Sequence, residues 1–326
     1  MKIFISNNAV SLSEVLSSFA KTATVEAEFG AECVDGTVAT LAHHGQRSSA
    51  PCPCLGDNID GGMGGESVDA IGVSHFDLDT IGGVMRILGL KNFDEEEGES
   101  LFWRAVAFID VNGVHKIGEF RMKEWRRACC HLTLAEMDNA DYFFGCEWED
   151  AMDSLNAFWA WSESNRLFAP CDGSVQDVSA FFLEAIRVLA LIVEGNTLNE
   201  EYVALNEAGR AWAKAKHDLE SESYVGEFGC IVLRDSEAFV NHLYDSHVNM
   251  NIKAVVALNS KTGAITVSLA DPIPGVSCCF IMQELFGPLA GGHAGIAGTP
   301  RGEVYDRNSA RGVMYHLAAV LATLSN

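Results

Sequence analysis

Three residues of types that bind metal ions alternate along one short stretch of the chain. His75, Asp77 and Asp79 lie in Val73-Ser-His-Phe-Asp-Leu-Asp-Thr-Ile-Gly-Gly83. Alternate side chains of an extended segment point to the same side, so the three converge if this stretch ends a strand. Imidazole with carboxylates suits Mn, Fe, Zn or Mg, and bridging carboxylates can hold a metal pair. The stretch therefore predicts a divalent-metal site where a buried strand meets a helix.

The same residues also fit a purely structural role. Asp77 or Asp79 would then be the N-cap of the following helix, and His75 would only be hydrogen-bonded. The residue types alone leave both interpretations open.

The pattern His-x-Asp-x-Asp at a strand-to-helix turn, followed by small residues, resembles the first motif of the DHH phosphoesterase family. Far downstream, Ile265-Thr-Val-Ser-Leu269, a helix candidate over 276–286 and Gly291-Gly-His-Ala-Gly-Ile-Ala-Gly298 follow one another. This order is similar to that of the family's DHH-associated C-terminal domain. The resemblance implies that the Gly-Gly-His loop helps to hold the substrate against the metals of the first domain.

Residue chemistry is consistent with an anion site at the glycine-rich loop. Gly291 and Gly292 leave backbone N–H groups free to approach an anion, and His293 adds a donor. Arg301 would supply a phosphate fork nearby. The alternatives are a glycine-rich connector with an exposed histidine and an ordinary surface arginine.

The chain departs from the family pattern between these two ends. It contains no Asp-His-His, and its adjacent histidines, His43 and His44, precede the first motif. The nearest substitutes are Asp110 and His115, which flank an Asn-Gly turn, and we predict them as the remaining ligands. A helix C-terminus with a polar turn explains them equally well.

The role of a second group of metal-binding residue types stays open at this stage. His43, His44, Cys52 and Cys54 lie close together in sequence, so they suggest a zinc site, but their spacing is not that of a standard finger. The alternatives are unliganded loop residues, or a histidine that faces the main site.

The hydrophobic patterns predict an α/β fold. We expect two domains, a parallel-sheet DHH-like domain with a helical middle over 1–220 and a smaller mixed-sheet domain over 221–326. Strands are expected at 2–6, at two places within 25–44, at 68–74 and 229–233, and on both sides of 259–263. Helices are expected at 80–88, 100–110, 122–137, 148–168, 175–194, 198–219, 236–244, 276–286 and 308–324.

Composition limits the classes of function. The chain has 326 residues, 48% of them hydrophobic, enough for a sizeable core. Its formal net charge of −23 disfavours duplex nucleic acid, because phosphate backbones are bound mainly by accumulated Lys and Arg. The apolar stretches are too short to span a bilayer, and the first residues do not resemble a signal peptide. Ten cysteines without a dense framework predict reduced thiols and a cytoplasmic location.

These observations together predict a metal-dependent hydrolase. The expected activity is a phosphoesterase or phosphodiesterase that uses one or two Mn²⁺ or Mg²⁺ ions on a small phosphorylated or nucleotide substrate in an interdomain cleft. Asp77, Asp79 and His293 are the expected catalytic residues, and His75, Asp77, Asp79, Asp110 and His115 the expected metal ligands. The alternatives are a non-catalytic ligand-binding protein of the same fold and a metal-dependent hydrolase of a non-phosphate ester. The oligomeric state is open, a homodimer included.

Overall fold

The computed structural model describes residues 1–29, 32–43, 47, 50–55, 68–90, 100–129, 133–244, 251–300 and 302–324. Its contacts divide the chain into two compact units, each described by itself below. The first unit contains Met1–Asn112 and Lys116–Trp212, and the second contains Gly113–His115 and Ala213–Asn326. Both units are mixed α/β structures whose sheets contain parallel strands.

The first unit is built on a sheet that has five strands in the described part of the chain, in the order β5-β2-β6-β1-β7. Strands β1, β2, β5 and β6 are parallel, and β7 runs antiparallel to β1. The strands are β1 (Lys2–Ile5), β2 (Thr22–Val25), β5 (Ala39–Leu41), β6 (Ala70–Val73) and β7 (Gln176–Asp177). A separate small sheet pairs β3 (Glu28–Phe29) with β4 (Glu32–Cys33).

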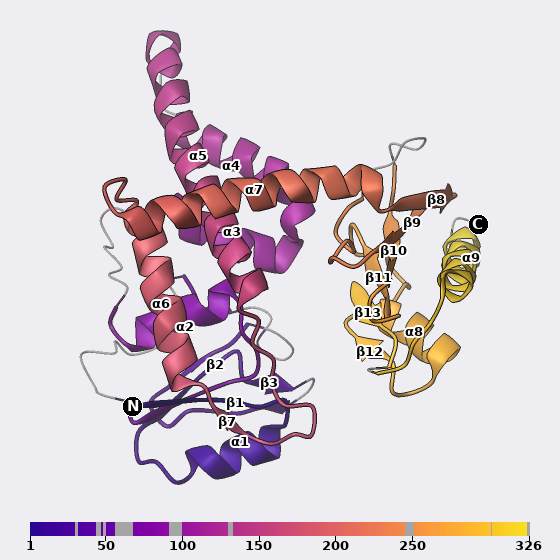
Figure 1. The fold of residues 1–326 in the computed structure, drawn as a ribbon, viewed down its shortest axis with the longest axis horizontal. Coiled ribbons are helices and arrows are strands. Elements are labelled where there is room, and N and C mark those ends of the chain that lie inside the picture. The colour runs from indigo at the N-terminus through magenta and orange to yellow at the C-terminus, as the bar shows by residue number, and fades with distance from the viewer. Residues whose placement is uncertain are drawn as a thin grey trace. The chain divides into compact units, whose positions relative to one another are not determined.

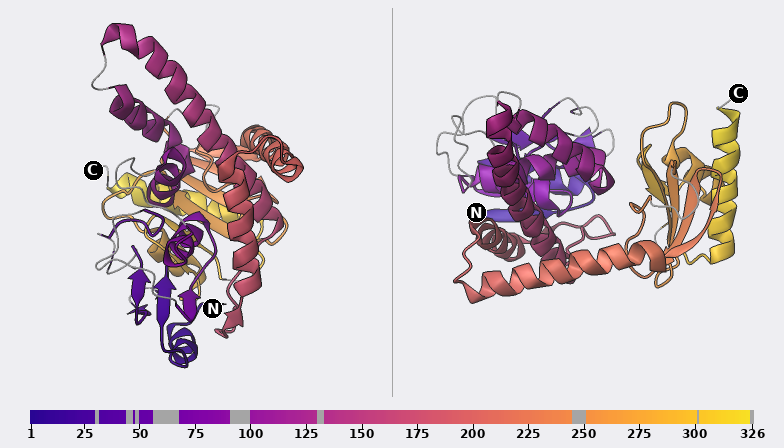
Figure 2. Two further views of the ribbon diagram at one scale, coloured as in Figure 1. Left: turned by 90° about the vertical axis from the view of Figure 1, so that its left-hand side faces the viewer. Right: turned by 90° about the horizontal axis from the view of Figure 1, so that it is seen from above.

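Helices cover both faces of this sheet. Alternate residues of a strand point to opposite faces, and β2 and β6 are buried throughout, so both faces are covered. Figures 1 and 2 show α1 (Ala9–Leu16) on one face and α2 (Leu78–Ile87) with α6 (Ser179–Glu194) on the other. On the α1 face, Leu12 and Leu16 pack against Phe4. On the other face, Ile3 and Ile5 belong to the main core.

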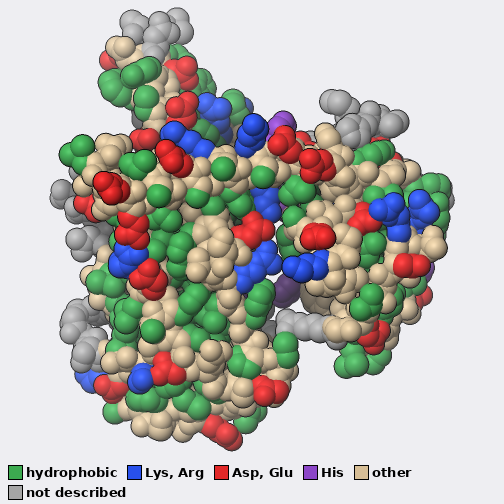
Figure 3. Space-filling view, in the orientation of Figure 1, with side chains coloured by type: hydrophobic (Ala, Val, Ile, Leu, Met, Phe, Trp, Pro, Cys, Tyr) green, Lys and Arg blue, Asp and Glu red, His purple; other side chains and the backbone are tan. Residues whose placement is uncertain are grey.

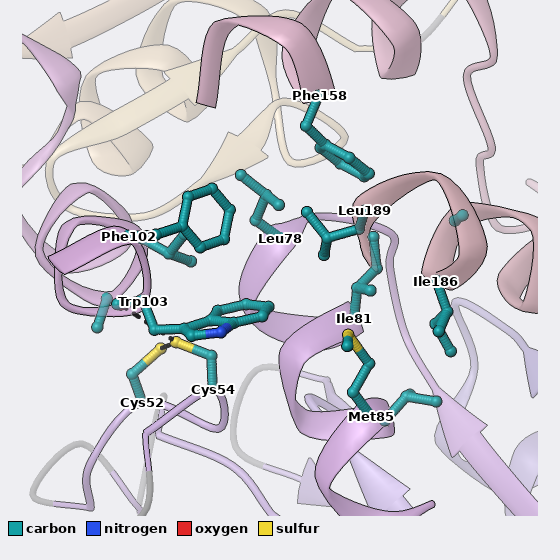
Figure 4. Close-up of a cluster of buried hydrophobic side chains, with 14 of the residues drawn as sticks. Cys52, Cys54, Leu78, Ile81, Met85, Phe102, Trp103, Phe158, Ile186 and Leu189 are labelled. Atoms are coloured by element: carbon teal, nitrogen blue, oxygen red, sulfur yellow. Dashed lines mark hydrogen bonds between the residues drawn. The ribbon is translucent and has the colours of Figure 1, made fainter. Parts of the chain in front are cut away.

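The middle of the chain is helical. It contains α3 (Leu101–Asn112), a short 3-10 turn (Val114–Lys116), α4 (Ile117–Cys129), α5 (Leu134–Ser164) and α7 (Glu200–Glu222). Aromatic side chains such as Phe102, Trp103 and Phe158 from these helices complete the main core (Figure 4).

The second unit contains a six-stranded sheet in its described residues, in the order β12-β13-β11-β10-β9-β8. Strands β9 and β10 are parallel, and the other neighbours are antiparallel. The elements are β8 (Tyr224–Phe228), β9 (Ile231–Ser236), β10 (Ala254–Asn259), β11 (Ile265–Leu269), α8 (Cys278–Phe286), β12 (Gly291–Gly292), β13 (Ile296–Gly298) and α9 (Arg307–Thr323). Helices α8 and α9 pack on one face of the sheet and share its core.

Two sequence-based predictions of elements are wrong, and strand β2 is not predicted at all. Thr22–Val25 is buried on both faces and shows no alternation, so no periodic pattern marks it as a strand. The helix expected over 122–137 is interrupted, because Thr133 and Glu136 form a capping box that starts α5. The helix expected over 236–244 is absent from those described residues, because β9 continues to Ser236 and turns follow it.

Among the described residues, no helix combines the length and the apolar character needed to cross a membrane.

Candidate metal centre

Four parallel strands of the first unit end in the same transverse row of the sheet. Val73 of β6 pairs with both Ile5 and Val25, and Val25 also pairs with Leu41. We call Ile5, Val73, Val25 and Leu41 the terminal row. Loops that follow the carboxyl ends of parallel strands form the usual ligand site of open α/β sheets.

Polar residues follow this terminal row at short, fixed offsets. Glu26 comes one residue after Val25, while His43 and His75 each come two residues after the row. Glu26 and His43 are buried. Glu26 also has a φ of 47°, an unusual conformation for a residue with a side chain, and the Ser74 hydroxyl donates to its carbonyl oxygen. The strand ends therefore converge on a buried polar site.

The buried ligand group consists of His43, Cys52, Asp79 and Asp110. Each offers one ligand atom, and these atoms all lie within 4.8 Å of one another. His43 Nε2 lies 3.0 Å from Asp110 Oδ2 and 3.4 Å from Asp79 Oδ2. The same nitrogen is 3.7 Å from Glu26 Oε1, and Cys52 Sγ is 3.7 Å from Asp79 Oδ2.

The half-exposed ligand group consists of His75, Asp77 and Asp79, whose ligand atoms also lie within 4.8 Å of one another. His75 Nε2 is 3.0 Å from Asp77 Oδ2, and 42% of each of these two side chains is exposed. Asp79 belongs to both groups. One carboxylate is therefore common to both candidate ligand groups.

Helix α2 positions the two aspartates of the motif. Asp77 is its N-cap and accepts a hydrogen bond of 3.1 Å from the Thr80 N–H. Asp79 lies in the first turn, where the helix dipole favours negative charge. The capped helix start and the ligand role, which the sequence presents as alternatives, are thus compatible in one structure.

Close packing of α2 places the segment that carries Cys52. A β-carbon on Gly82 would lie 2.5 Å from Cys54 Cβ, and one on Gly83 would lie 2.9 Å from Pro53 Cβ. Only glycine permits this approach. The Arg86 guanidinium donates to the Pro53 carbonyl oxygen at 2.9 Å, which ties the segment to the same helix.

The electrostatics of the two groups favour cation binding. Burial, together with the carboxylates of Asp77 and Asp110, raises the pKa of Asp79 well above its usual value. Burial also raises the pKa of Glu26 to about 8. A divalent cation would remove this cost by neutralising the clustered carboxylates, so the donor set fits such an ion.

Neighbouring carboxylates also raise the pKa values of His43 and His75. Burial alone would lower the pKa of His75, but Asp77 raises it to about 9. In turn, His75 and the Thr80 hydrogen bond hold the pKa of Asp77 well below its usual range, against the effect of burial. Burial likewise opposes the charge of His43, and Asp110 and Glu26 raise its pKa overall.

The structure places the predicted ligands in two different environments. Asp110, at the end of α3, lies in the buried ligand group with Asp79. His115 belongs to neither group. Its Nε2 lies 2.9 Å from the Ala270 carbonyl oxygen, and its ring packs on Tyr244 in the second unit.

The predicted substrate-binding residues lie in the second unit. Gly291 and Gly292 form β12, and the His293 side chain is exposed. Gly292 has a φ of 146°, and a β-carbon there would lie 2.4 Å from the Ile296 carbonyl oxygen. The His293 N–H donates to that same oxygen at 2.6 Å, so this amide is engaged within the loop. Arg301 and His44 lie outside the described residues.

Glu26, His43 and Cys52 enter the site although the sequence interpretation does not assign them to it. The sequence does not single out Glu26. It leaves His43 and Cys52 open between a separate zinc site and no ligand role, with a place facing the main site as a further alternative for a histidine. For Glu26 and His43, the available signal was a polar residue one or two positions after a short apolar strand. It becomes informative only when the strand order brings those ends together.

Comparisons with known proteins assign no family to the chain. No family model matches it, and no curated protein matches it. A solved structure of an uncharacterized protein from Helicobacter pylori G27 is similar over 78% of this chain and 75% of its own chain, with 14% identity and a TM-score of 0.20.

Proposed function

We propose that this protein is a divalent-metal-dependent phosphoesterase or phosphodiesterase that acts on a small phosphorylated or nucleotide substrate. The observation that carries the proposal is the membership of Asp79 in both ligand groups. A carboxylate shared by two neighbouring metal positions can hold a metal pair for in-line phosphoryl chemistry. The resemblance of the His75–Asp79 motif to the DHH family supports the same reaction class.

In this proposal, His43, Cys52, Asp79 and Asp110 hold one ion, and His75, Asp77 and Asp79 hold the other. Bound ions would activate water and neutralise charge on the phosphoryl group. The residues of the chain orient the ligands. Ser74 Oγ lies 2.8 Å from His75 Nδ1, which leaves His75 Nε2 as the ligand atom, and the Thr80 N–H fixes Asp77 through its Oδ1.

We propose that Gly291, Gly292 and the His293 side chain bind the anionic part of the substrate. Their exposure and the glycine-dependent backbone at Gly292 support this role. A small substrate also fits the surface charge. On the face in Figure 3, acidic side chains are spread over both units and Lys and Arg side chains form only small groups, unlike a nucleic-acid-binding face.

The test combines metal analysis with hydrolysis assays. Purified protein loaded with Mn²⁺ should bind the ion in a stoichiometric amount and release product from a chromogenic phosphodiester. Asp79→Asn should lose ions from both groups and lose turnover, while Asp218→Asn, an exposed change on α7, should keep both. A protein that binds no Mn²⁺ by calorimetry, or a fully active Asp79→Asn variant, would refute the proposal.

A non-catalytic binding protein is the second candidate, favoured by the absence of an Asp-His-His sequence. The same assays distinguish it. A protein that binds metal and a nucleotide but cleaves neither a phosphodiester nor an acyl ester is the binding protein. Cleavage of the acyl ester alone would instead identify a hydrolase of a non-phosphate ester.

A further inference from the structure

The two ligand groups differ in one chemical respect, which is the presence of sulfur. The half-exposed ligand group offers one imidazole and two carboxylates, all hard or borderline donors. The buried ligand group adds the thiol of Cys52 to an imidazole and two carboxylates. Thiolate ligands favour zinc and related transition metals, whereas carboxylates suit Mg²⁺ and Mn²⁺. The groups should therefore select different ions.

The position of the Cys52 thiol is defined on several sides. Its Sγ lies 3.7 Å from Asp79 Oδ2 and 3.3 Å from Cys54 Sγ. Pro53 stiffens the segment, and its carbonyl oxygen accepts the hydrogen bond from Arg86. Figure 4 shows the two cysteines side by side against Trp103. The thiol is thus held at the carboxylate by a rigid local structure.

The neighbouring Cys54 shows what a cysteine with only a packing role looks like, and Cys52 can be compared with it. Buried cysteines often act as small apolar residues that fill a core. Cys54 does so, because it is fully buried, packs closely on Gly82 and contacts the Trp103 carbonyl oxygen. It is not a member of the buried ligand group, whereas Cys52 is. Cys52 alone of this pair faces the carboxylates.

We propose that the buried ligand group is a thiolate-ligated transition-metal site, in which Cys52 with His43, Asp79 and Asp110 binds an ion of the zinc, iron(II) or cobalt(II) class. The inference rests on the proposed metal centre and gives its two positions different metals. Coordination converts the Cys52 thiol to a thiolate, and the released proton passes to the solvent buffer. No oxidation or reduction is involved.

Cobalt spectroscopy tests the proposal on the full chain. Metal-free protein titrated with Co²⁺ should develop a near-ultraviolet thiolate-to-cobalt charge-transfer band. Cys52→Ser should abolish the band and weaken Zn²⁺ binding by roughly tenfold or more. Cys54→Ser is the matched control and should keep the band. A band that survives in Cys52→Ser, or that disappears in Cys54→Ser, would overturn the assignment.

A second measurement needs no variant and so does not depend on variant folding. X-ray absorption of the zinc-loaded wild-type protein should show a sulfur neighbour at about 2.3 Å from zinc. A shell of nitrogen and oxygen neighbours alone would overturn the inference.

The two proposals fail in different ways. Manganese-dependent phosphodiester cleavage without any zinc–sulfur contact would leave the function standing and refute the thiolate site. A thiolate–cobalt band in a protein that cleaves no phosphodiester would leave the thiolate site standing and refute the function.

Discussion

At the scale of single residues, Asp77 combines two tasks that substitution can separate. Its Oδ1 caps helix α2 through the Thr80 N–H, and its Oδ2 faces His75 in the half-exposed ligand group. An asparagine at this position retains an oxygen for the cap but loses the carboxylate charge. An alanine loses both.

We predict that Asp77→Ala lowers metal-dependent phosphate release on the order of 100-fold and the free energy of unfolding by about 1 kcal/mol. Asp77→Asn should lose as much activity and remain as stable as the wild-type protein, because the cap persists. Steady-state kinetics and urea denaturation of both variants measure the two effects. Unchanged turnover in Asp77→Ala would remove this residue from the mechanism.

A second residue-scale prediction concerns acid stability. Asp177 accepts hydrogen bonds from Lys2 Nζ and from Ser179, and these bonds lower its pKa to about 2. Since the folded pKa lies below the usual 3.8, the stabilising contribution is present above pH 3.8 and is lost as the pH falls toward 2. The Asp177 side chain is 40% exposed, so solvent screening keeps its contribution to stability small.

We therefore expect Asp177→Asn to lower the free energy of unfolding by about 0.5 kcal/mol at pH 7. The difference from the wild-type protein should shrink between pH 3.8 and 2. Denaturation curves recorded across this pH range measure it. A difference that does not change with pH would show that the lowered pKa of Asp177 makes no contribution.

The ligand residues illustrate how far sequence reasoning reaches at this scale. His75, Asp77 and Asp79 could be found because a local period of two places them on one side of a strand end. His43 and Cys52 could not be assigned, because their neighbours in space are set by pairing of β2 with β5 and by packing against α2. The contacts of His43 and Cys52 depend on residues that are far apart in the sequence, whereas the His75–Asp79 motif lies within one short stretch.

At the scale of elements, helix α2 depends on two glycines that permit its close contacts. Gly82 lies against Cys54 and Trp103, and Gly83 lies against Val25 and Pro53. A methyl group at either position would contact atoms at 2.5 Å, and the buried neighbours have little room to move. The helix and the Cys52 segment are therefore coupled mechanically.

We predict that Gly82→Ala lowers the free energy of unfolding by about 1–3 kcal/mol through overpacking and also weakens metal binding. The matched control is Gly145→Ala in α5, where a β-carbon meets no atom within 4 Å. The control should be neutral or more stable by up to about 1 kcal/mol, because alanine favours a helix. Thermal denaturation and Zn²⁺ titration measure both effects, and equal results for the two variants would contradict the packing argument.

Helices and strands were predictable where the sequence shows hydrophobic periodicity or a helix-capping residue. Helix α9 and strands β10 and β11 lie close to where hydrophobic spacing puts them. Strand β2 was missed because a segment that is buried on both faces shows no hydrophobic alternation. Over 236–244 turns replace the expected helix, and the Leu243 carbonyl oxygen there accepts a hydrogen bond from buried Arg234 of β9.

At the scale of the whole molecule, metal ions bound to the two ligand groups should stabilise the folded protein. Ligands that bind only the folded state stabilise it, and the two groups hold carboxylates whose mutual repulsion an ion relieves. The formal net charge of −23 adds a general preference for cations.

We predict that removing metal with a chelator lowers the melting temperature by several degrees and that Mn²⁺ or Zn²⁺ restores it. Asp79→Asn should show little response to either treatment, because it weakens both groups. Differential scanning calorimetry with and without chelator measures the shift. An equal response in the wild-type and variant proteins would place the stabilising ions elsewhere.

The terminal row has a consequence for how the chain can change in length. The positions of Glu26, His43 and His75 are counted from Val25, Leu41 and Val73 at the ends of three strands. Insertions or deletions between Glu26 and β5 would renumber the later ligands without moving them. A single added residue between Leu41 and His43 would instead displace the imidazole by about 3.3 Å. Searches for related proteins should therefore fix the offset from each strand end and leave the spacing between motifs free.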